Sequence, residues 1–394
     1  MPTSALRNPK AAWLILACYC ATAATTQVLW LSYAAIDTKA ASTLGVDVSA
    51  VGDLALIMPL AYILFAIPCG RWLDRRFELA LGCGAGLTAL GGLIRVTSPA
   101  SFAVQCLGQC VIAIGQPLVL NALTEVSTRY FPAKQRSLVI SAGTASLFVG
   151  ILISVLAGDP LFANGGLHSV LAFEALPTVV IALALIACLA KWRTAVDRTP
   201  VVGASTWMFH DRLMLPLAGL VLIGMGTYNG IATWLQPILD KYGEGDAAGN
   251  LVAIMTGAGI LGAATLAPWA AHANRRRRLL FGSLGMSVLA LAAMSLRHQT
   301  PWIGGWLAAE GLLLMASLPV VLDWSEMHAG PHRQAVATGF LLMAGNVGGL
   351  LIPGLMQVVL DQPAWALLLL SIVAACGLPL VMRLPATVAR PTSR

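Results

Sequence analysis

Twelve apolar runs, each about as long as a helix that crosses a lipid bilayer, follow one another along this 394-residue chain. A spanning helix needs about 20 mainly apolar residues. Charged residues make up only 10% of the chain, against roughly 25% in soluble domains. We therefore predict an all-α membrane protein with twelve transmembrane helices. The predicted spans are residues 12–36, 50–69, 79–97, 102–124, 138–158, 168–190, 213–237, 249–270, 279–296, 301–322, 334–357 and 362–384.

The basic residues fall in alternate connections between these runs. When the connections are assigned in turn to the two sides of the membrane, 20 of the 24 Lys and Arg residues lie on one side. Connections rich in Lys and Arg stay in the cytoplasm. We therefore expect both termini to be cytoplasmic and the chain to lie in the cell (inner) membrane as a multi-pass protein. With an odd number of spans, the Lys and Arg residues would not fall mainly on one side of the membrane.

The two halves of the chain resemble each other. Three pairs of segments recur in one order at offsets of 200, 202 and 204 residues, namely 68–76 with 268–276, 117–121 with 319–323, and 30–31 with 234–235. This repetition predicts two parallel six-helix pseudo-repeats, residues 1–190 and 213–394, joined by a cytoplasmic linker at 191–212. Parallel repeats of this kind place the substrate path between the halves, near the middle of the membrane.

One connection carries a recognisable motif. The segment Gly70-Arg-Trp-Leu-Asp74-Arg75-Arg76 is similar to the cytoplasmic G-x-x-x-D-R-x-G-R-R signature of the major facilitator superfamily. It departs from that signature after Arg76, where Phe77 and Glu78 stand in place of the usual Gly-Arg pair. The resemblance covers the whole chain and implies a secondary transporter.

The same resemblance suggests a gate on the cytoplasmic side. We expect the Asp74 carboxylate to pair with a basic residue or to cap a helix N-terminus when that side closes. The alternative is that the basic residues only fix the topology, a role that a carboxylate does not serve. The gating candidates are Asp74, Arg75, Arg76, Glu125, Arg129 and Arg136.

Two subfamily resemblances remain open. Trp30, Gln116-Pro117 and Tyr228-Asn229 look like the feline-leukaemia-virus-receptor-like carriers of choline and related solutes. The Gly-Leu-Ile-Arg95 and Pro-Leu-Val-Leu patterns look equally like bacterial transporters of the cyanate type.

Polar side chains at mid-membrane depth indicate where a solute binds, because lipid penalises them. In the first run, Gln27, Trp30, Ala34 and Asp37 are spaced to share one helical face. Similar amides occur in the fourth, seventh and eleventh runs. The alternative is that these amides join neighbouring helices and that Trp30 is an interfacial tryptophan. The substrate-binding candidates are Gln27, Trp30, Tyr33, Gln116, Tyr228, Asn229, Trp234 and Asn346.

Acidic residues inside the spans are candidates for proton coupling. Glu310 lies near the middle of the tenth run and Asp37 near the outer end of the first. A buried carboxylate can carry a proton, but it can also be a neutral, hydrogen-bonded packing group. Arg95 lies at the outer end of the third run, where we expect its side chain to snorkel to the interface.

Several function classes do not fit the sequence. All six histidines fall in loops or at helix ends, and no G-x-x-x-x-G-K-[ST] motif occurs. We therefore expect no enzyme activity, cofactor or metal site. The eight cysteines lie in or beside apolar runs and read as small apolar side chains. The expected partners are a small-molecule solute and the bilayer, with no nucleic acid, and a monomer is expected.

Three functions are compatible with the sequence. The first is secondary-active or facilitative transport of a small organic solute by alternating access. An aromatic and amide-lined site suits a neutral or quaternary-ammonium solute better than an organic anion, although an organic anion stays an alternative. The second is a proton-coupled exporter of drugs or metabolites. The third is a membrane receptor or scaffold that transports nothing.

Overall fold

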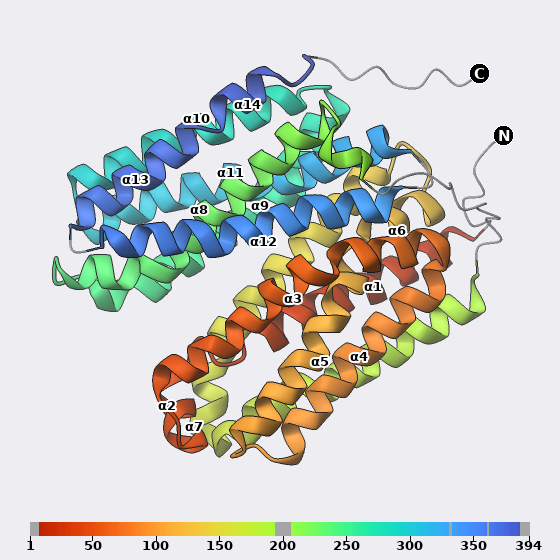
Figure 1. The fold of residues 1–394 in the computed structure, drawn as a ribbon, viewed down its shortest axis with the longest axis horizontal. Coiled ribbons are helices and arrows are strands. Elements are labelled where there is room, and N and C mark those ends of the chain that lie inside the picture. The colour runs from red at the N-terminus through yellow and green to blue at the C-terminus, as the bar shows by residue number, and fades with distance from the viewer. Residues whose placement is uncertain (1–7, 194–205, 331–332, 361, 387–394) are drawn as a thin grey trace. The chain divides into compact units, whose positions relative to one another are not determined.

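The computed structural model describes residues 8–193, 206–330, 333–360 and 362–386, and every long element within these ranges is a helix (Figure 1). The α-helices are α1 (Pro9–Trp30), α2 (Asp37–Leu44), α3 (Val48–Arg75), α4 (Phe77–Thr97), α5 (Phe102–Leu120), α6 (Leu123–Tyr130), α7 (Arg136–Lys191), α8 (Met214–Asp240), α9 (Ala248–His272), α10 (Arg276–Leu296), α11 (Thr300–Ala329), α12 (Gln334–Val358), α13 (Pro363–Ala375) and α14 (Leu378–Met382). Two short 3-10 helices, η1 (Trp207–Phe209) and η2 (Gly245–Ala247), complete the elements.

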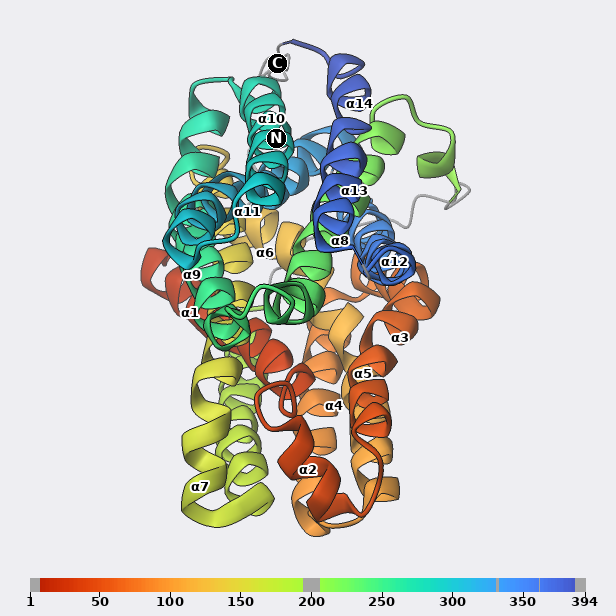
Figure 2. The ribbon, with the colours of Figure 1, turned by 90° about the vertical axis from the view of Figure 1, so that its left-hand side faces the viewer.

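Eleven helical stretches in the described part of the chain are long and apolar enough to cross a membrane. One of them, α7, has 56 residues and contains non-helical backbone at Gly165 and Gly166. Gly166 has a φ of 64°, which glycine adopts without a Cβ penalty. The chain reverses direction there, so that α7 supplies two antiparallel spans (Figures 1 and 2). The prediction of an all-α membrane protein with twelve spans is confirmed.

Some predicted helices end earlier or extend further than expected. The first predicted helix, 12–36, is wrong beyond Trp30, because residues 31–36 form turns before α2 begins at Asp37. Consequently Asp37 does not share a helical face with Gln27 and Trp30. The second span is longer than predicted, since α3 has 28 residues, or roughly 42 Å at 1.5 Å per residue. The signature at 70–75 is therefore the last turns of a helix rather than a loop.

The described chain divides into two compact units. Unit 1 comprises residues 1–205 and 326–343, and unit 2 comprises residues 206–325 and 344–394. Unit 1 thus includes the segment where α11 ends and α12 begins. Residues 194–205, which form most of the predicted linker, lie outside the described residues.

Glycines allow the helices within each unit to pack closely. In unit 1, a Cβ on Gly91 of α4 would lie 2.6 Å from the carbonyl oxygen of Gly108 in α5. A Cβ on Gly115 of α5 would lie 2.8 Å from the carbonyl oxygen of Gly84. Small residues of this kind let membrane helices approach backbone to backbone. They fix α4 against α5, the two helices that carry Arg95, Gln105 and Gln109 of the buried polar cluster described below.

The outward face of unit 1 is apolar. On the second arm of α7, the side chains of Leu176, Val180 and Leu183 are 63%, 66% and 62% exposed. Their spacing of four and three residues places them on one helical stripe. A stripe of exposed leucine and valine is the surface that a lipid-facing helix requires.

Candidate functional site

The end of α1 is the centre of the buried polar structure in unit 1. An α-helix leaves its last four carbonyl groups without helical partners. In hydrocarbon, each unsatisfied group costs several kcal/mol. The carbonyls of Gln27, Val28, Leu29 and Trp30 therefore need other donors, because α1 stops at Trp30.

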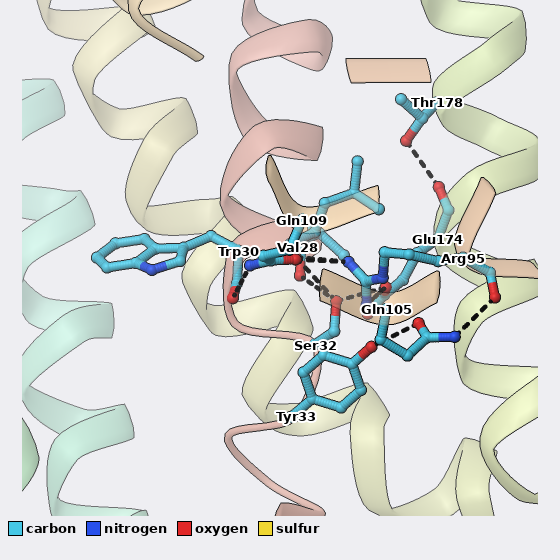
Figure 3. Close-up of polar contacts among 10 residues, drawn as sticks. Val28, Trp30, Ser32, Tyr33, Arg95, Gln105, Gln109, Glu174 and Thr178 are labelled. Carbon is cyan, nitrogen blue, oxygen red and sulfur yellow. Dashed lines mark hydrogen bonds and ion pairs between the residues drawn. The ribbon is translucent and has the colours of Figure 1, made fainter. Parts of the chain in front are cut away.

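Side chains and the following turn supply those donors. The Leu31 N–H donates to the Gln27 carbonyl at 3.2 Å. The Ser32 hydroxyl lies 3.0 Å from the Leu29 carbonyl and 3.4 Å from that of Val28. From other helices, Arg95 Nη1 donates to the Leu29 carbonyl at 2.9 Å. Figure 3 shows Val28, Ser32 and Arg95 close together at this helix end.

Gln109 of α5 links this arginine to the last residue of α1. Arg95 Nη1 also donates to Gln109 Oε1 at 3.2 Å. The Gln109 Nε2 group in turn donates to the Trp30 carbonyl at 3.4 Å (Figure 3). Both the guanidinium and the amide are fully buried, so the two side chains close the helix end away from lipid.

An acidic residue from the second arm of α7 accompanies the arginine. Arg95 Nη2 and Glu174 Oε2 lie 3.5 Å apart, and the Ser32 hydroxyl donates to the same oxygen at 2.6 Å. The guanidinium also lies 5.0 Å from the centroid of the Tyr33 ring, within the range of a cation–π contact. The buried positive charge therefore faces a carboxylate, a carbonyl, an amide oxygen and an aromatic ring.

Gln105 completes the cluster next to the C-terminal end of α4. The Tyr33 hydroxyl donates to Gln105 Oε1 at 2.8 Å. Gln105 Nε2 donates to the backbone carbonyls of Arg95 and Ser98, each at 3.0 Å. These bonds fix the end of α4 and the turn after α1 to α5 (Figure 3).

The expectation that Arg95 snorkels to the membrane interface is wrong. Its side chain is fully buried at 0% exposure, because the broken end of α1 and Glu174 offer acceptors inside the unit. The sequence carried a signal for this arrangement. Gln105 and Gln109 stand four residues apart on one face of an apolar helix, and unpaired charges in two other apolar runs usually find each other.

The remaining candidates of unit 1 have separate surroundings. Trp30 is half-buried, and its indole N–H donates to the Ala55 carbonyl in α3 at 2.8 Å. Gln27 and Gln116 are buried at 4% exposure each. Asp37 is exposed and accepts from the N–H and hydroxyl of Thr38. It therefore lacks the burial on which the coupling hypothesis for this residue depends.

The substrate-binding candidates of unit 2 belong to α8 and α12. The Tyr228 hydroxyl lies 3.2 Å from that of Thr256 in α9. The Trp234 indole N–H donates to the Pro353 carbonyl in α12 at 2.8 Å. Asn229 lies against α12, where a Cβ on Gly349 would be 2.3 Å from its Nδ2 atom. Asn346 is half-buried on the same helix.

Glu310 is the most buried acid of unit 2. Its side chain in α11 is fully buried, and the Ser287 hydroxyl of α10 donates to its Oε1 atom at 2.7 Å. Among the described residues, no partner contacts the other carboxyl oxygen, Oε2. Burying a polar oxygen without a hydrogen bond is costly, so Glu310 is an unusual group at this position in α11.

The gating candidate Asp74 caps a helix within unit 1. Its Oδ1 atom accepts from the Ala335 N–H at 3.0 Å, and its Oδ2 atom accepts from the Val336 N–H at 3.3 Å. Both amides belong to the first turn of α12, where the helix dipole favours a carboxylate. Gly70, one turn earlier in α3, makes room for this contact, because a Cβ there would lie 2.6 Å from the Val336 Cα atom.

Two ion pairs surround this cap. Glu125 and Arg129 pair within α6 at 2.7 Å, and Arg129 lies 4.6 Å from the centroid of the Phe77 ring. Arg136 at the start of α7 pairs with Glu326 at 3.1 Å. By contrast, the side chains of Arg75 and Arg76 are exposed.

A further contact extends the connection between α6 and α12. The Thr128 hydroxyl donates to the side-chain oxygen of Gln334 at 2.7 Å, and the amide of Gln334 donates to Glu326 at 3.3 Å. Thr124 and Thr338 share a hydrogen bond of 2.8 Å. Sequence reasoning missed Gln334 and Glu326, because nothing in their local pattern indicates contact with residues about 200 positions earlier.

Known proteins with a similar sequence or fold agree on one class. The zebrafish (Danio rerio) protein "Solute carrier family 49 member A3" is 25% identical over 365 residues, which cover 85% of this chain and 76% of that protein. The human organic anion transporter MFSD10 has a TM-score of 0.76 at 12% identity, covering 94% of this chain and 99% of that structure. The Escherichia coli transporter FucP in its outward conformation has a TM-score of 0.71 at 14% identity, covering 95% and 100%.

A family-wide sequence pattern also matches most of this chain. The sequence pattern of the Major Facilitator Superfamily matches residues 12–353, which include all of the polar clusters described above. The fold, the spans and the relatives are those of transporters rather than of enzymes. The chain therefore belongs to the Major Facilitator Superfamily and is a multi-pass transporter of that type.

Proposed function

We propose that this transporter carries a small organic solute across the inner membrane by alternating access, as a secondary-active or facilitative carrier with both termini in the cytoplasm. The observation that carries the proposal is the cap that Asp74 forms on α12. Its two hydrogen bonds join segments 261 and 262 residues apart in the sequence. A contact of this kind stabilises one arrangement of the helices and must break in another.

The ring of polar contacts around the cap supports the same interpretation. Hydrogen bonds from Thr124 and Thr128 to α12 and the Arg136–Glu326 ion pair would also separate when the predicted cytoplasmic side opens. Exposed surface charges contribute little to stability, whereas these groups are largely buried. They therefore suit a gate better than a role in topology alone.

The side chains available for a solute favour a neutral or quaternary-ammonium compound. Trp30, Tyr228 and Trp234 offer aromatic faces, which attract organic cations. Arg95, a buried cation of unit 1, already contacts a carboxylate and two other acceptors. A small organic anion, as transported by the human neighbour of similar fold, therefore finds less support.

Uptake of radiolabelled choline into proteoliposomes tests this proposal. We expect saturable uptake by the wild-type protein and a raised KM in Trp30→Ala. Trp365→Ala is the matched control, because this tryptophan is 59% exposed on α13. If Trp30→Ala and Trp365→Ala show the same KM, Trp30 does not contact the solute. An absence of uptake by the wild-type protein would remove choline-like amines as substrates.

Glu310 favours a second candidate function, a proton-coupled exporter. Its fully buried carboxyl group has one oxygen bound by Ser287 and the other free of partners among the described residues. Such a group can bind and release a proton as its surroundings change. We expect Glu310→Gln to abolish transport driven by a pH gradient while leaving exchange of solute between equal pH compartments. Unchanged pH-driven transport in this variant would exclude Glu310 as the coupling group.

A further inference from the structure

We propose that Arg95 acts as the C-terminal cap of the interrupted helix α1, and that through this cap it positions Trp30. In this role the guanidinium is held mainly by the helix end and Gln109, and the carboxylate of Glu174 is an accessory partner. Arg95 is therefore a positioning residue and does not touch the solute.

The distances support this order of importance. The contact between Arg95 and the Leu29 carbonyl is 2.9 Å, and that with Gln109 is 3.2 Å. The contact with Glu174 is longer, at 3.5 Å, whereas Ser32 donates to Glu174 at 2.6 Å. The carboxylate thus has its shortest bond with a hydroxyl group and not with the guanidinium.

The electrostatics of the helix end point in the same direction. The C-terminus of a helix carries a partial negative charge that favours a cation. At the end of α1, the Leu29 carbonyl is buried and the Trp30 carbonyl is partly buried, and a bare carbonyl inside the membrane is costly. Arg95 donates directly to the Leu29 carbonyl. Gln109, which accepts from Arg95, donates through its Nε2 atom to the Trp30 carbonyl at 3.4 Å.

The connection to Trp30 follows from its place in the chain. Trp30 is the last residue of α1, and its carbonyl and its indole N–H are held by different helices, α5 and α3. Loss of the cap frees the backbone at this residue while the indole bond to Ala55 remains. The ring would then be held only through its N–H group, and its position would no longer be fixed from the backbone as well. This second step, from backbone to solute, rests on the proposed function.

Hydrogen exchange of the purified protein in lipid nanodiscs tests the cap itself. The reporter is the turn at 31–36, where backbone bonds join Ala34 to Leu31 and Ile36 to Tyr33. Its exchange rate is compared with that of α5, so that a general loss of stability cancels. We expect Arg95→Met to speed exchange at 31–36 by roughly tenfold to a hundredfold, as losing a charged hydrogen bond implies.

The acidic partner provides the decisive comparison. We expect Glu174→Gln to leave the exchange rate of the turn within about threefold of wild type, well below the effect of a lost charged bond. We expect the double variant Arg95→Met/Glu174→Gln to stay as fast as Arg95→Met. If instead Glu174→Gln is as fast as Arg95→Met and the double variant returns to the wild-type rate, Arg95 serves only as an ion-pair partner and the proposal fails.

Gln109→Leu tests the cap with every charge in place. It removes the amide that joins Arg95 to the Trp30 carbonyl, so we expect faster exchange at 31–36 here also. An unchanged rate in Gln109→Leu would overturn the proposed path from Arg95 to the Trp30 carbonyl, even if Arg95→Met failed to fold.

Choline uptake then tests the positioning of Trp30. We expect Arg95→Lys, which keeps a donor for the Leu29 carbonyl, to restore the choline KM that Arg95→Met raises. Equal KM values in wild type and Arg95→Met, with altered exchange, would contradict positioning. If the wild-type protein does not transport choline, the proposed substrate class fails, whereas hydrogen exchange still decides the cap.

Discussion

Replacing Gly70 by alanine should open the contact between α3 and α12. The added Cβ would lie 2.6 Å from the Val336 Cα atom and 2.9 Å from both the Val336 nitrogen and the Ala335 carbonyl oxygen. These are backbone atoms, so no side-chain rotation relieves the overlap, and the start of α12 must move. That movement lengthens both hydrogen bonds to Asp74.

The size of the effect follows from those contacts. A hydrogen bond to a charged group contributes about 1.5–3 kcal/mol, and overpacking a close interface costs about 1–3 kcal/mol. If the capped arrangement loses about 2–3 kcal/mol, its population relative to the open arrangement falls roughly 30- to 150-fold. We expect this shift to appear as exposure of residues that are buried behind the cap.

A cysteine at Thr338 reports that exposure. Thr338 is fully buried, and its hydroxyl pairs with Thr124. In a chain whose native cysteines are replaced, the rate at which Thr338→Cys reacts with a membrane-impermeant maleimide measures the open fraction. We expect Gly70→Ala to raise this rate by at least tenfold if the shift in population is roughly 30-fold or more.

A glycine in the next helix provides the matched control. A Cβ on Gly86 of α4 would meet nothing within 4 Å, so Gly86→Ala should leave the maleimide rate unchanged. Equal rates in Gly70→Ala and Gly86→Ala would refute the argument that Gly70 permits the cap. Asp74→Asn, which keeps one acceptor but loses the charge, should give an intermediate rate.

Two further predictions concern the stability of unit 2, and both are measured by thermal unfolding in detergent. Gly348→Ala should destabilise it by about 1–3 kcal/mol, because a Cβ there would lie 2.0 Å from the Leu222 carbonyl oxygen. Gly354→Ala, where nothing lies within 4 Å, should be neutral, and equal unfolding temperatures would contradict the packing. Arg276→Met should cost about 3–5 kcal/mol, since it breaks a largely buried ion pair with Asp323 at 2.6 Å. Adding Asp323→Leu should restore most of this loss, and a double variant no more stable than Arg276→Met would show that the pair is not the cause.

The sequence predicted the spans well because lipid imposes a strict rule on each of them. Length and apolar composition determine whether a segment can cross a bilayer, and this requirement does not depend on the neighbouring helices. The break in α7 could also be foreseen, since Gly165-Gly166 separates two apolar runs. A helix cap was one of the two roles expected for Asp74, the other being a pair with a basic residue, but its partner α12 could not be named.

The buried cluster was less accessible to sequence reasoning. The sequence places Arg95 near the interface and gives no reason to pair it with Glu174, because the two residues lie in separate apolar runs. Their burial depends on four helices meeting at one point, which no local pattern records. Gln105 and Gln109 stand four residues apart on one face of α5, but this spacing does not reveal their acceptors in α4 and α1.

The two ends of the first predicted helix show most clearly what the sequence determines and what the tertiary structure decides. Its beginning, near Pro9, follows from the change from polar to apolar residues and from a proline suited to the first helical turn. Its end does not, because residues 31–36 read Leu-Ser-Tyr-Ala-Ala-Ile and are compatible with a continuing helix. The interruption at Trp30 is compatible with the membrane because Arg95 and Gln109 donate to the Leu29 and Trp30 carbonyls that it leaves free. The sequence alone therefore determined that a helix crosses the membrane here, and only the tertiary structure decided where it is interrupted, since the acceptors and donors come from separate parts of the chain.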